Sequence, residues 1–156
     1  MSAQNDHAAV LVPPPVALVV CVLAGVVANW FWPAPFLPMG HARGLDSGFL
    51  IAVGVGIALW AVIRFRLART SVRPDRPTSA ILSSGPYRFS RNPIYLGMFL
   101  VVLGLAVAFD SLWQLAALAA LYLVLRWGVV AREEAYLTRK FGDAYLDYTR
   151  RVRRWI

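Results

Sequence analysis

The chain has 156 residues, of which 59% are hydrophobic and only 15% are charged. Soluble domains carry about 25% charged residues, and a chain of this length has too little interior to bury such an apolar excess. The composition therefore excludes an ordinary soluble domain, and it excludes an intrinsically disordered chain, which needs low hydrophobicity. Because Cys21 is the single cysteine, a disulfide-stabilised scaffold is excluded as well. We expect a small integral membrane protein.

The net charge is +8, from 16 basic and 8 acidic residues. Seven arginines lie from Arg64 to Arg91, eight basic residues lie from Arg126 to Arg154, and only Arg43 falls elsewhere. A basic excess can indicate nucleic-acid binding, but two basic clusters separated by an apolar hairpin are typical of one cytoplasmic membrane face. We therefore expect a membrane partner and no nucleic-acid partner.

Four apolar segments are long enough, or nearly so, to cross a bilayer core, which takes about 20 helical residues. We expect the corresponding helices over residues 13–32, 47–65, 93–109 and 112–130. The first begins at three consecutive prolines, which a helix start tolerates. The third is short, and Ser111 can cap the fourth.

The topology follows from the number of spans and the distribution of basic residues. Residues 1–9 hold no Lys or Arg, so they lack the basic region of a signal peptide, and we expect the first apolar segment to be retained. Four spans place both termini on one side, and the positive-inside rule makes that side the cytoplasm. We expect an inner or plasma membrane protein in which 1–67 hold two spans and 68–156 form the functional half. The first two helices leave room for a homodimer contact.

The residues after the fourth apolar segment predict an amphipathic helix. Charges recur on a helical period, and one stripe of that helix would carry apolar and aromatic side chains, namely Leu137, Phe141, Tyr145 and Tyr148. We expect Gly142 to end one helix and Asp143 to cap the next. The predicted fold class is thus all-α, an integral membrane protein with four transmembrane helices and a cytoplasmic C-terminal amphipathic helix. The proline-containing segment 68–92 is not expected to form one helix.

Several kinds of site are excluded by residue type. His7 and His41 lie outside the basic clusters and Cys21 lies alone in a span, so no zinc site and no Cys/His or Ser/His pair is predicted. Gly54-Val55-Gly56 lies in an apolar span without the rest of a dinucleotide-binding motif. It predicts close helix packing through small residues.

The third apolar segment begins with a concentrated polar motif. Asn92-Pro93 is typical of a helix start, with Asn92 as the cap, and the free N–H groups of a first turn can bind an anionic group. Tyr87 and Tyr95 could pack an aromatic or cationic ligand. The alternative is a membrane-entry motif with arginines at the headgroups and tyrosines in the aromatic belt. On these residues alone the alternative is favoured.

A second polar motif, Arg132-Glu133-Glu134, follows the fourth apolar segment. Carboxylates are unusual at a boundary where anionic lipids repel them, and one of them could hold the ammonium group of a ligand. The alternative is a surface network in which these glutamates pair with nearby arginines. The residue types alone do not decide between the two.

Together, the two motifs resemble the isoprenylcysteine carboxyl methyltransferase family and its bacterial phospholipid-methyltransferase-like relatives. That family has Gly-x-Tyr followed by Arg-His-Pro-x-Tyr-x-Gly, and this chain has Gly85-Pro86-Tyr87 and then Arg91-Asn92-Pro93-Ile94-Tyr95-Leu96-Gly97. The family's Glu-Glu-x-x-Leu-x-x-x-Phe-Gly-x-x-Tyr-x-x-Tyr is similar to the run from Glu133 to Tyr148. The resemblance covers roughly residues 70–156.

The resemblance implies a membrane-embedded methyltransferase that uses S-adenosylmethionine. It implies that the cofactor-binding residues come from the two motifs, namely Tyr87, Arg91, Asn92, Pro93, Ile94, Tyr95, Glu133 and Glu134, with segment 79–82 as a weaker candidate. Asn92 stands where many members have histidine. Val129 aligns with a substrate-side arginine of the family, so we expect Arg126 or Arg132, each three residues away, to orient the acceptor as the catalytic arginine.

The expected reaction is an in-line displacement in which the acceptor attacks the sulfonium methyl group, and catalysis rests on alignment and desolvation. A carboxylate or thiolate acceptor needs no general base, which suits a site without histidine. We expect a lipophilic acceptor that enters laterally from the membrane. Two alternatives stay open, a membrane reductase-like protein with a nicotinamide cofactor and a non-catalytic protein whose basic clusters bind anionic lipid.

Overall fold

The computed structural model describes residues 7–38, 43–71 and 77–156, and within these ranges every regular element is helical and no strand occurs. The all-α prediction is therefore confirmed for the described residues. The four longest apolar elements are α1 (Pro14–Phe31), α2 (Arg43–Leu67), α3 (Pro93–Phe109) and α4 (Leu112–Leu123). The bounds of α3 are those expected from the sequence. The helix α2 is longer at both ends than the predicted 47–65.

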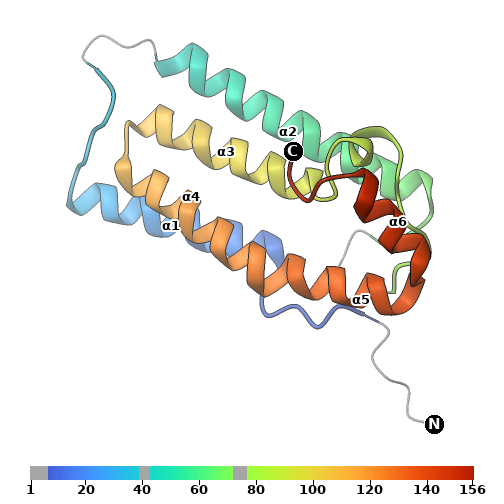
Figure 1. The fold of residues 1–156 in the computed structure, drawn as a ribbon. Helices are drawn as coiled ribbons and strands as arrows, with labels where there is room; N and C mark the ends of the chain where they lie inside the picture. Colours follow the sequence, from blue (N-terminus) through green and yellow to red (C-terminus); the bar gives the residue numbers. More distant parts are fainter. Residues whose placement is uncertain (1–6, 39–42, 72–76) are drawn as a thin grey trace.

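The helices lie side by side in the order α2, α3, α4, α1 (Figure 1). Glycines bring α2 and α3 into close contact, since a Cβ atom on Gly97 would lie 2.5 Å from the carbonyl oxygen of Gly54. This is the small-residue packing by which membrane helices approach one another, so that expectation is confirmed for Gly54. It does not hold for Gly56, where an added Cβ would meet nothing within 4 Å.

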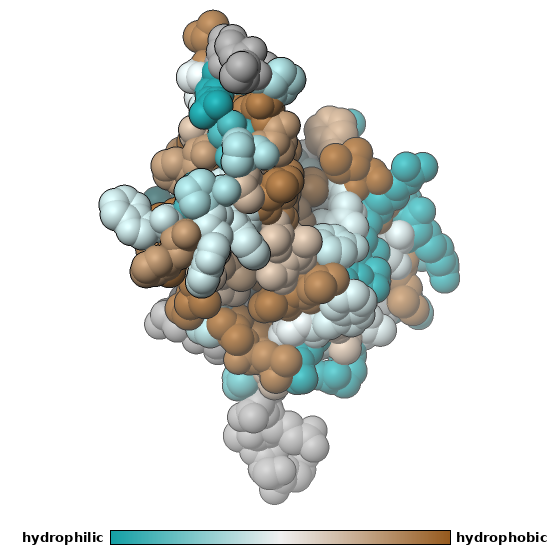
Figure 2. Space-filling model, turned by 90° about the vertical axis from the view of Figure 1, so that its left-hand side faces the viewer, coloured by the Kyte–Doolittle hydropathy of each residue, from teal (hydrophilic) through white to brown (hydrophobic). Residues whose placement is uncertain are grey.

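Among the described residues, three helices are long and apolar enough to cross a membrane, namely Pro14–Phe31, Arg43–Leu67 and the continuous helix Leu112–Phe141. Their outward side chains are apolar and exposed, as at Val19, Leu23 and Leu59. Figure 2, viewed from the end that holds the α1–α2 connection, shows hydrophobic residues over much of the surface in view. These features identify a membrane protein. The fourth expected span, α3, has 17 residues and stays a prediction.

The fourth apolar segment continues further than expected. After α4 the chain forms a π-helix, η2 (Val124–Val130), and then α5 (Ala131–Phe141) without a break. The N–H of Leu11 donates a hydrogen bond of 3.1 Å to the carbonyl of Gly128 in η2. A carbonyl of the wide π-helical turn is thus paired with a residue near the N-terminus. The Ser111 cap is confirmed, because its Oγ accepts a hydrogen bond from Gln114 N at 3.3 Å. We take α4 and η2 as the membrane-spanning part and the charged α5 as lying beyond it.

The chain turns sharply between α5 and α6 (Asp143–Arg151) at Gly142, whose φ of +53° favours glycine. The prediction that Asp143 caps α6 was wrong, because Gly142 occupies the cap position and Asp143 is already helical. The predicted stripe faces inward. Tyr145 and Tyr148 form a buried cluster, against which the neighbouring apolar side chains pack, namely Ile81, Leu137 and Phe141. The expected cytoplasmic placement of this segment stays a prediction.

The described part of the α2–α3 connection is irregular except for a short 3-10 helix, η1 (Gly85–Arg88). Gly85 has a φ of +62°, and a Cβ there would lie 3.2 Å from the side chain of Arg64. The ring of Tyr87 meets that of Phe65 edge to face, with centroids 5.5 Å apart. The end of α2 and η1 thus fix Tyr87 beside the start of α3.

Candidate functional site

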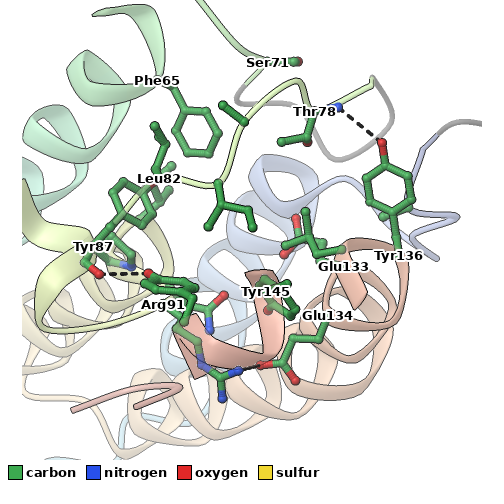
Figure 3. Close-up of a pocket in the computed structure, with 18 of the residues that line it drawn as sticks. Phe65, Ser71, Thr78, Leu82, Tyr87, Arg91, Glu133, Glu134, Tyr136 and Tyr145 are labelled. Carbon is green, nitrogen blue, oxygen red and sulfur yellow. Dashed lines mark hydrogen bonds and ion pairs between the residues drawn. The ribbon is translucent and has the colours of Figure 1, made fainter. Parts of the chain in front are cut away.

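At one end of the bundle α5 and α6 meet the α2–α3 connection (Figure 1). A pocket lies there (Figure 3). The space free of atoms inside its lining is about 850 Å³, part of which is open to solvent. The structure brings all eight predicted cofactor residues into the lining, namely Tyr87, Arg91, Asn92, Pro93, Ile94, Tyr95, Glu133 and Glu134. From segment 79–82, Ala80, Ile81 and Leu82 also line it.

Glu133 and Tyr95 join the two motifs inside this pocket. The hydroxyl of Tyr95, in the first turn of α3, donates a hydrogen bond of 2.8 Å to Oε1 of Glu133 in α5. Desolvation raises the pKa of Glu133 to about 7, the hydrogen bond from Tyr95 acts in the opposite direction, and the charge of Glu134 adds to the rise. A carboxylate that lacks water and a full counter-charge is suited to hold a cationic ligand group.

Glu134 has arginines on two sides. Arg91 Nη1 lies 3.2 Å from Oε1 of Glu134, as Figure 3 shows. Arg154 makes a forked interaction, with Nε 2.9 Å from Oε1 and Nη2 2.6 Å from Oε2. Such bidentate pairs are stronger and more directional than single hydrogen bonds. The nearby carboxylate raises the pKa of Arg154 through these hydrogen bonds.

Asn92 holds the predicted cap position of α3, but its side chain makes no capping hydrogen bond. Its Nδ2 instead donates to the carbonyl of Arg154 at 2.9 Å. The prediction of a capping side chain was therefore wrong, because a carbonyl of the C-terminal tail lies within reach of the amide. The N–H of Tyr95 already donates to Asn92 O, so the first turn offers fewer free N–H groups to an anion than expected.

Aromatic rings form the remaining wall of the pocket. Tyr148 donates a hydrogen bond of 2.8 Å to the carbonyl of Tyr87, and the rings of Tyr145 and Tyr148 have centroids 6.2 Å apart. Burial raises the pKa of Tyr145 to about 12, the charge of Glu134 acts in the same direction, and Arg91 opposes it. Burial also raises the pKa values of Tyr87 and Tyr148. These phenols are therefore neutral at physiological pH and present uncharged aromatic surfaces.

The segment 78–82, which lines the pocket, is attached to α5. The N–H of Thr78 donates to Tyr136 Oη at 3.3 Å, which Figure 3 shows as a dashed line. Lys140 Nζ donates to the same oxygen at 3.0 Å. Sequence reasoning did not select Tyr136, Phe65 or Arg154 for the site. Phe65 lies near the end of α2 and Tyr136 lies at an unspecified position of the second motif's run, and neither carries a signal that separates it from other apolar positions.

The structure does not bring the two predicted catalytic arginines into the pocket lining. Arg132 is exposed, and its Nη1 donates a hydrogen bond of 3.1 Å to the carbonyl of Ala9. The guanidinium of Arg126 lies 5.9 Å from the ring centroid of Trp127. Val129, between them, is fully buried. Their role toward an acceptor stays a prediction.

No group of three or more His, Cys, Asp or Glu residues in the described ranges is arranged to hold a metal ion. His41, which the sequence places outside the basic clusters, lies outside the described residues. The site described above is built from aromatic rings, carboxylates and arginines.

A family model described as phospholipid methyltransferase matches residues 45–144. The matched region runs from α2 to the start of α6 and contains the first motif and Arg132-Glu133-Glu134 of the second. The apolar helices and this match together identify a membrane protein of a methyltransferase family. The chain belongs to the phospholipid methyltransferase family. The resemblance drawn from the motifs is thereby confirmed.

Individual relatives are similar over part of their length. The nickel-cobalt-cadmium resistance protein NccN of Alcaligenes xylosoxydans xylosoxydans is 31% identical over 117 residues, which are 72% of this chain and 54% of that protein. The cobalt-zinc-cadmium resistance protein CzcN of Cupriavidus metallidurans is 32% identical over 120 residues, 74% of this chain and 54% of that protein. This chain thus spans about half the length of these two relatives.

A third relative is short. An uncharacterized protein of Haemophilus influenzae is 35% identical over 63 residues, which are 40% of this chain and all of that protein. No solved structure shows a significant match to the chain.

Proposed function

We propose that this protein transfers a methyl group from S-adenosylmethionine to a lipophilic acceptor at the membrane surface. The observation that carries the proposal is the convergence of all eight motif residues on one pocket at the polar end of an apolar helical bundle. Residues that only anchored a helix at the headgroups would not need to surround a shared cavity with two carboxylates and several aromatic rings. Membership of a methyltransferase family supports the same reaction class.

The residues of the pocket fit the chemical groups of the cofactor. Glu133 suits the ammonium group, and Arg91 suits the carboxylate. Arg91 Nε is buried and has no hydrogen-bond partner among the described residues, which supports a role for an added acceptor. Tyr87, Tyr145 and Tyr148 offer ring faces for the adenine and for the positive sulfonium.

When bound, the cofactor supplies an electrophilic methyl group on its sulfonium sulfur. The chain's own residues then have to orient the two reactants and exclude water. Tyr95 fixes the carboxylate of Glu133 by its hydrogen bond of 2.8 Å. The rings of Tyr87, Tyr145 and Tyr148 keep apolar surface around the reacting groups. A carboxylate or thiolate acceptor suits this pocket, since such a nucleophile need not be deprotonated by the protein.

We propose that the acceptor reaches the pocket laterally from the bilayer, with Arg126 or Arg132 orienting its anionic end. The pocket would then face the cytoplasm of an inner or plasma membrane, with both termini on that side, as the basic clusters suggest. Contact between two copies through α1 and α2 remains part of this proposal, because these helices carry much of the exposed apolar surface.

The proposal is tested by calorimetric titration of S-adenosylhomocysteine into detergent-purified protein. We expect saturable binding, and no saturable binding when a reduced nicotinamide dinucleotide phosphate is titrated instead. Folded protein that binds only the nicotinamide would support the reductase alternative. Folded protein that binds neither ligand would contradict the proposal and favour a lipid-binding role.

A further inference from the structure

The last residues of the chain lie outside the family match, which ends at residue 144, yet they pack directly on the start of α3. Arg91 N donates to the carbonyl of Arg153 at 3.0 Å. Ser90 Oγ and Asn92 Nδ2 donate to the carbonyl of Arg154 at 3.3 Å and 2.9 Å. These three bonds hold the backbone at residue 154 beside the first motif.

The neighbouring Trp155 anchors the tail on its other side. Its ring lies 5.4 Å from that of Phe99 in α3 and 5.7 Å from that of Tyr122 in α4, measured between centroids. Such tilted ring pairs add to the energy of apolar burial. The backbone of Arg154 is therefore fixed between polar contacts at the pocket and aromatic contacts along the bundle, so its side chain has a defined direction.

That side chain reaches Glu134, which also contacts Arg91. The network is partly shielded from solvent, since the side chains of Arg91, Glu134 and Arg154 are 13%, 17% and 32% exposed. Ion pairs in such positions are screened less than pairs in open solvent. Figure 3 shows the guanidinium of Arg91 and the carboxylate of Glu134 at the edge of the pocket.

The charges in this network do not cancel. Two guanidinium groups share one carboxylate, so a net positive charge remains. The forked bond of Arg154 occupies both oxygens of Glu134, whereas Arg91 contacts it through a single pair at 3.2 Å. Without Arg154, Glu134 would be free to form a closer one-to-one pair with Arg91 and to neutralise it.

We propose that Arg154 is a positioning residue that holds Glu134, so that Arg91 keeps its place in the pocket and its capacity to bind the carboxylate of the cofactor. This inference rests on the proposed function and adds a residue that lies outside the two motifs. Loss of Arg154 should therefore weaken ligand binding selectively. Arg154 acts through Glu134 and Arg91 on the binding of the amino-acid part of the ligand, whereas the adenosine part binds to the aromatic rings.

The test compares two ligands in calorimetric titrations of the full-length protein. S-adenosylhomocysteine carries the amino-acid group, and 5′-methylthioadenosine keeps the adenosine and thioether without it. For Arg154→Ala we expect S-adenosylhomocysteine to bind about tenfold more weakly, as for loss of one charge-assisted interaction, with methylthioadenosine changed less than about twofold. Arg154→Lys, which keeps the charge but not the fork, should fall between the parent and Arg154→Ala.

The matched control is Arg150→Ala, which removes an exposed arginine of α6 whose Nη1 lies 2.9 Å from Oδ1 of exposed Asp147. Its affinity for both ligands should equal that of the parent. A second comparison uses Glu134→Gln as the background. If Arg154 acts through Glu134, Arg154→Lys in that background should change the affinity for S-adenosylhomocysteine less than it does in the parent.

The outcomes separate the inference from the proposed function. Equal weakening of both ligands, or no weakening of S-adenosylhomocysteine, would overturn the positioning role while leaving the cofactor site in place. A Glu134→Gln background that leaves the full effect of Arg154→Lys would overturn it too. A folded parent that binds neither ligand would overturn the proposed function, and the inference with it.

Discussion

The two ends of the helical bundle each hold a shielded carboxylate, but the two carboxylates have different surroundings. At the end opposite the pocket, Asp110 Oδ1 accepts hydrogen bonds of 2.8 Å from the N–H groups of Phe36 and Leu37. Its Oδ2 lies 2.7 Å from Arg43 Nη2. Both oxygens are occupied by the chain itself. At the pocket end, Glu133 receives a hydrogen bond from Tyr95 and borders open space.

The comparison shows why residue type alone does not identify a site. Asp110 is a structural clamp that fixes the α1–α2 connection on the α3–α4 turn, and its side chain is only 4% exposed. Glu133 accepts a hydrogen bond from Tyr95 and borders a cavity that aromatic rings also line. A shielded carboxylate is thus a candidate for binding when space beside it remains for a ligand.

The largest effect is expected at the clamp. Asp110→Ala removes two hydrogen bonds to a charged acceptor and an ion pair, and should lower the free energy of unfolding by about 3 kcal/mol or more. Unfolding followed by circular dichroism in detergent would measure this change. The fraction that stays folded should bind S-adenosylhomocysteine as the parent does. A loss of affinity in that fraction would mean that the two ends are coupled.

Glu133→Gln should weaken ligand binding and leave stability nearly unchanged, which is the opposite of the pattern expected for Asp110→Ala. It keeps the shape of the side chain but removes the charge that would hold an ammonium group, so we expect about 100-fold weaker binding of S-adenosylhomocysteine and a nearly unchanged unfolding transition. Calorimetry and the same unfolding experiment check both parts. Asp147→Asn, at an exposed position of α6, is the matched control. If Glu133→Gln retained parent affinity, Glu133 would have no part in binding.

Gly97 lies on α3, the helix that runs from the pocket to the clamp, so Gly97→Ala tests the packing between the two ends. An added Cβ would lie 2.5 Å from Gly54 O, so α2 and α3 must separate, at a cost of about 1–3 kcal/mol. Gly56→Ala is the control, since nothing lies within 4 Å of that position. It should be neutral or slightly stabilising, as alanine favours a helix. Equal unfolding midpoints for the two variants would contradict the close packing.

The smallest predicted effect is a pH dependence. With a pKa of about 7, Glu133 is largely ionised at pH 8 and largely protonated at pH 6. Only the ionised form attracts an ammonium group, so affinity for S-adenosylhomocysteine should fall as the pH falls, by about tenfold between these values. Titrations at the two pH values test this. Glu133→Gln should remove the dependence, and an unchanged slope in that variant would assign it to another group.

Much of the fold could be predicted because local signals marked it. The bounds of α3 follow from Pro93 at its first position and from Asp110 and Ser111 at its end. The residues of each motif are adjacent in sequence. The α3–α4 hairpin brings the chain back to the start of α3, so the two motifs meet there. The stripe of α5 and α6 followed from its helical period.

The remaining features depend on contacts between distant residues. The carbonyl of Gly128 in the π-helix η2 accepts a hydrogen bond from Leu11, which is distant in sequence. No local sequence pattern predicts this π-helix. Arg154 is one of several arginines in a short run, and only the docking of the tail on Asn92 distinguishes it from the others. The same tail carbonyl takes the Asn92 side chain away from the capping role that its position predicted.

We propose that the pocket between Glu133 and Arg91 is the cofactor site of a methyltransferase. A crystal structure of the protein bound to S-adenosylhomocysteine would show whether this is so. We expect the ligand in this pocket, with its ammonium beside Glu133, its carboxylate beside Arg91 and its adenine against the rings of Tyr87, Tyr145 and Tyr148. A ligand bound elsewhere, or an empty pocket at saturating ligand, would contradict it.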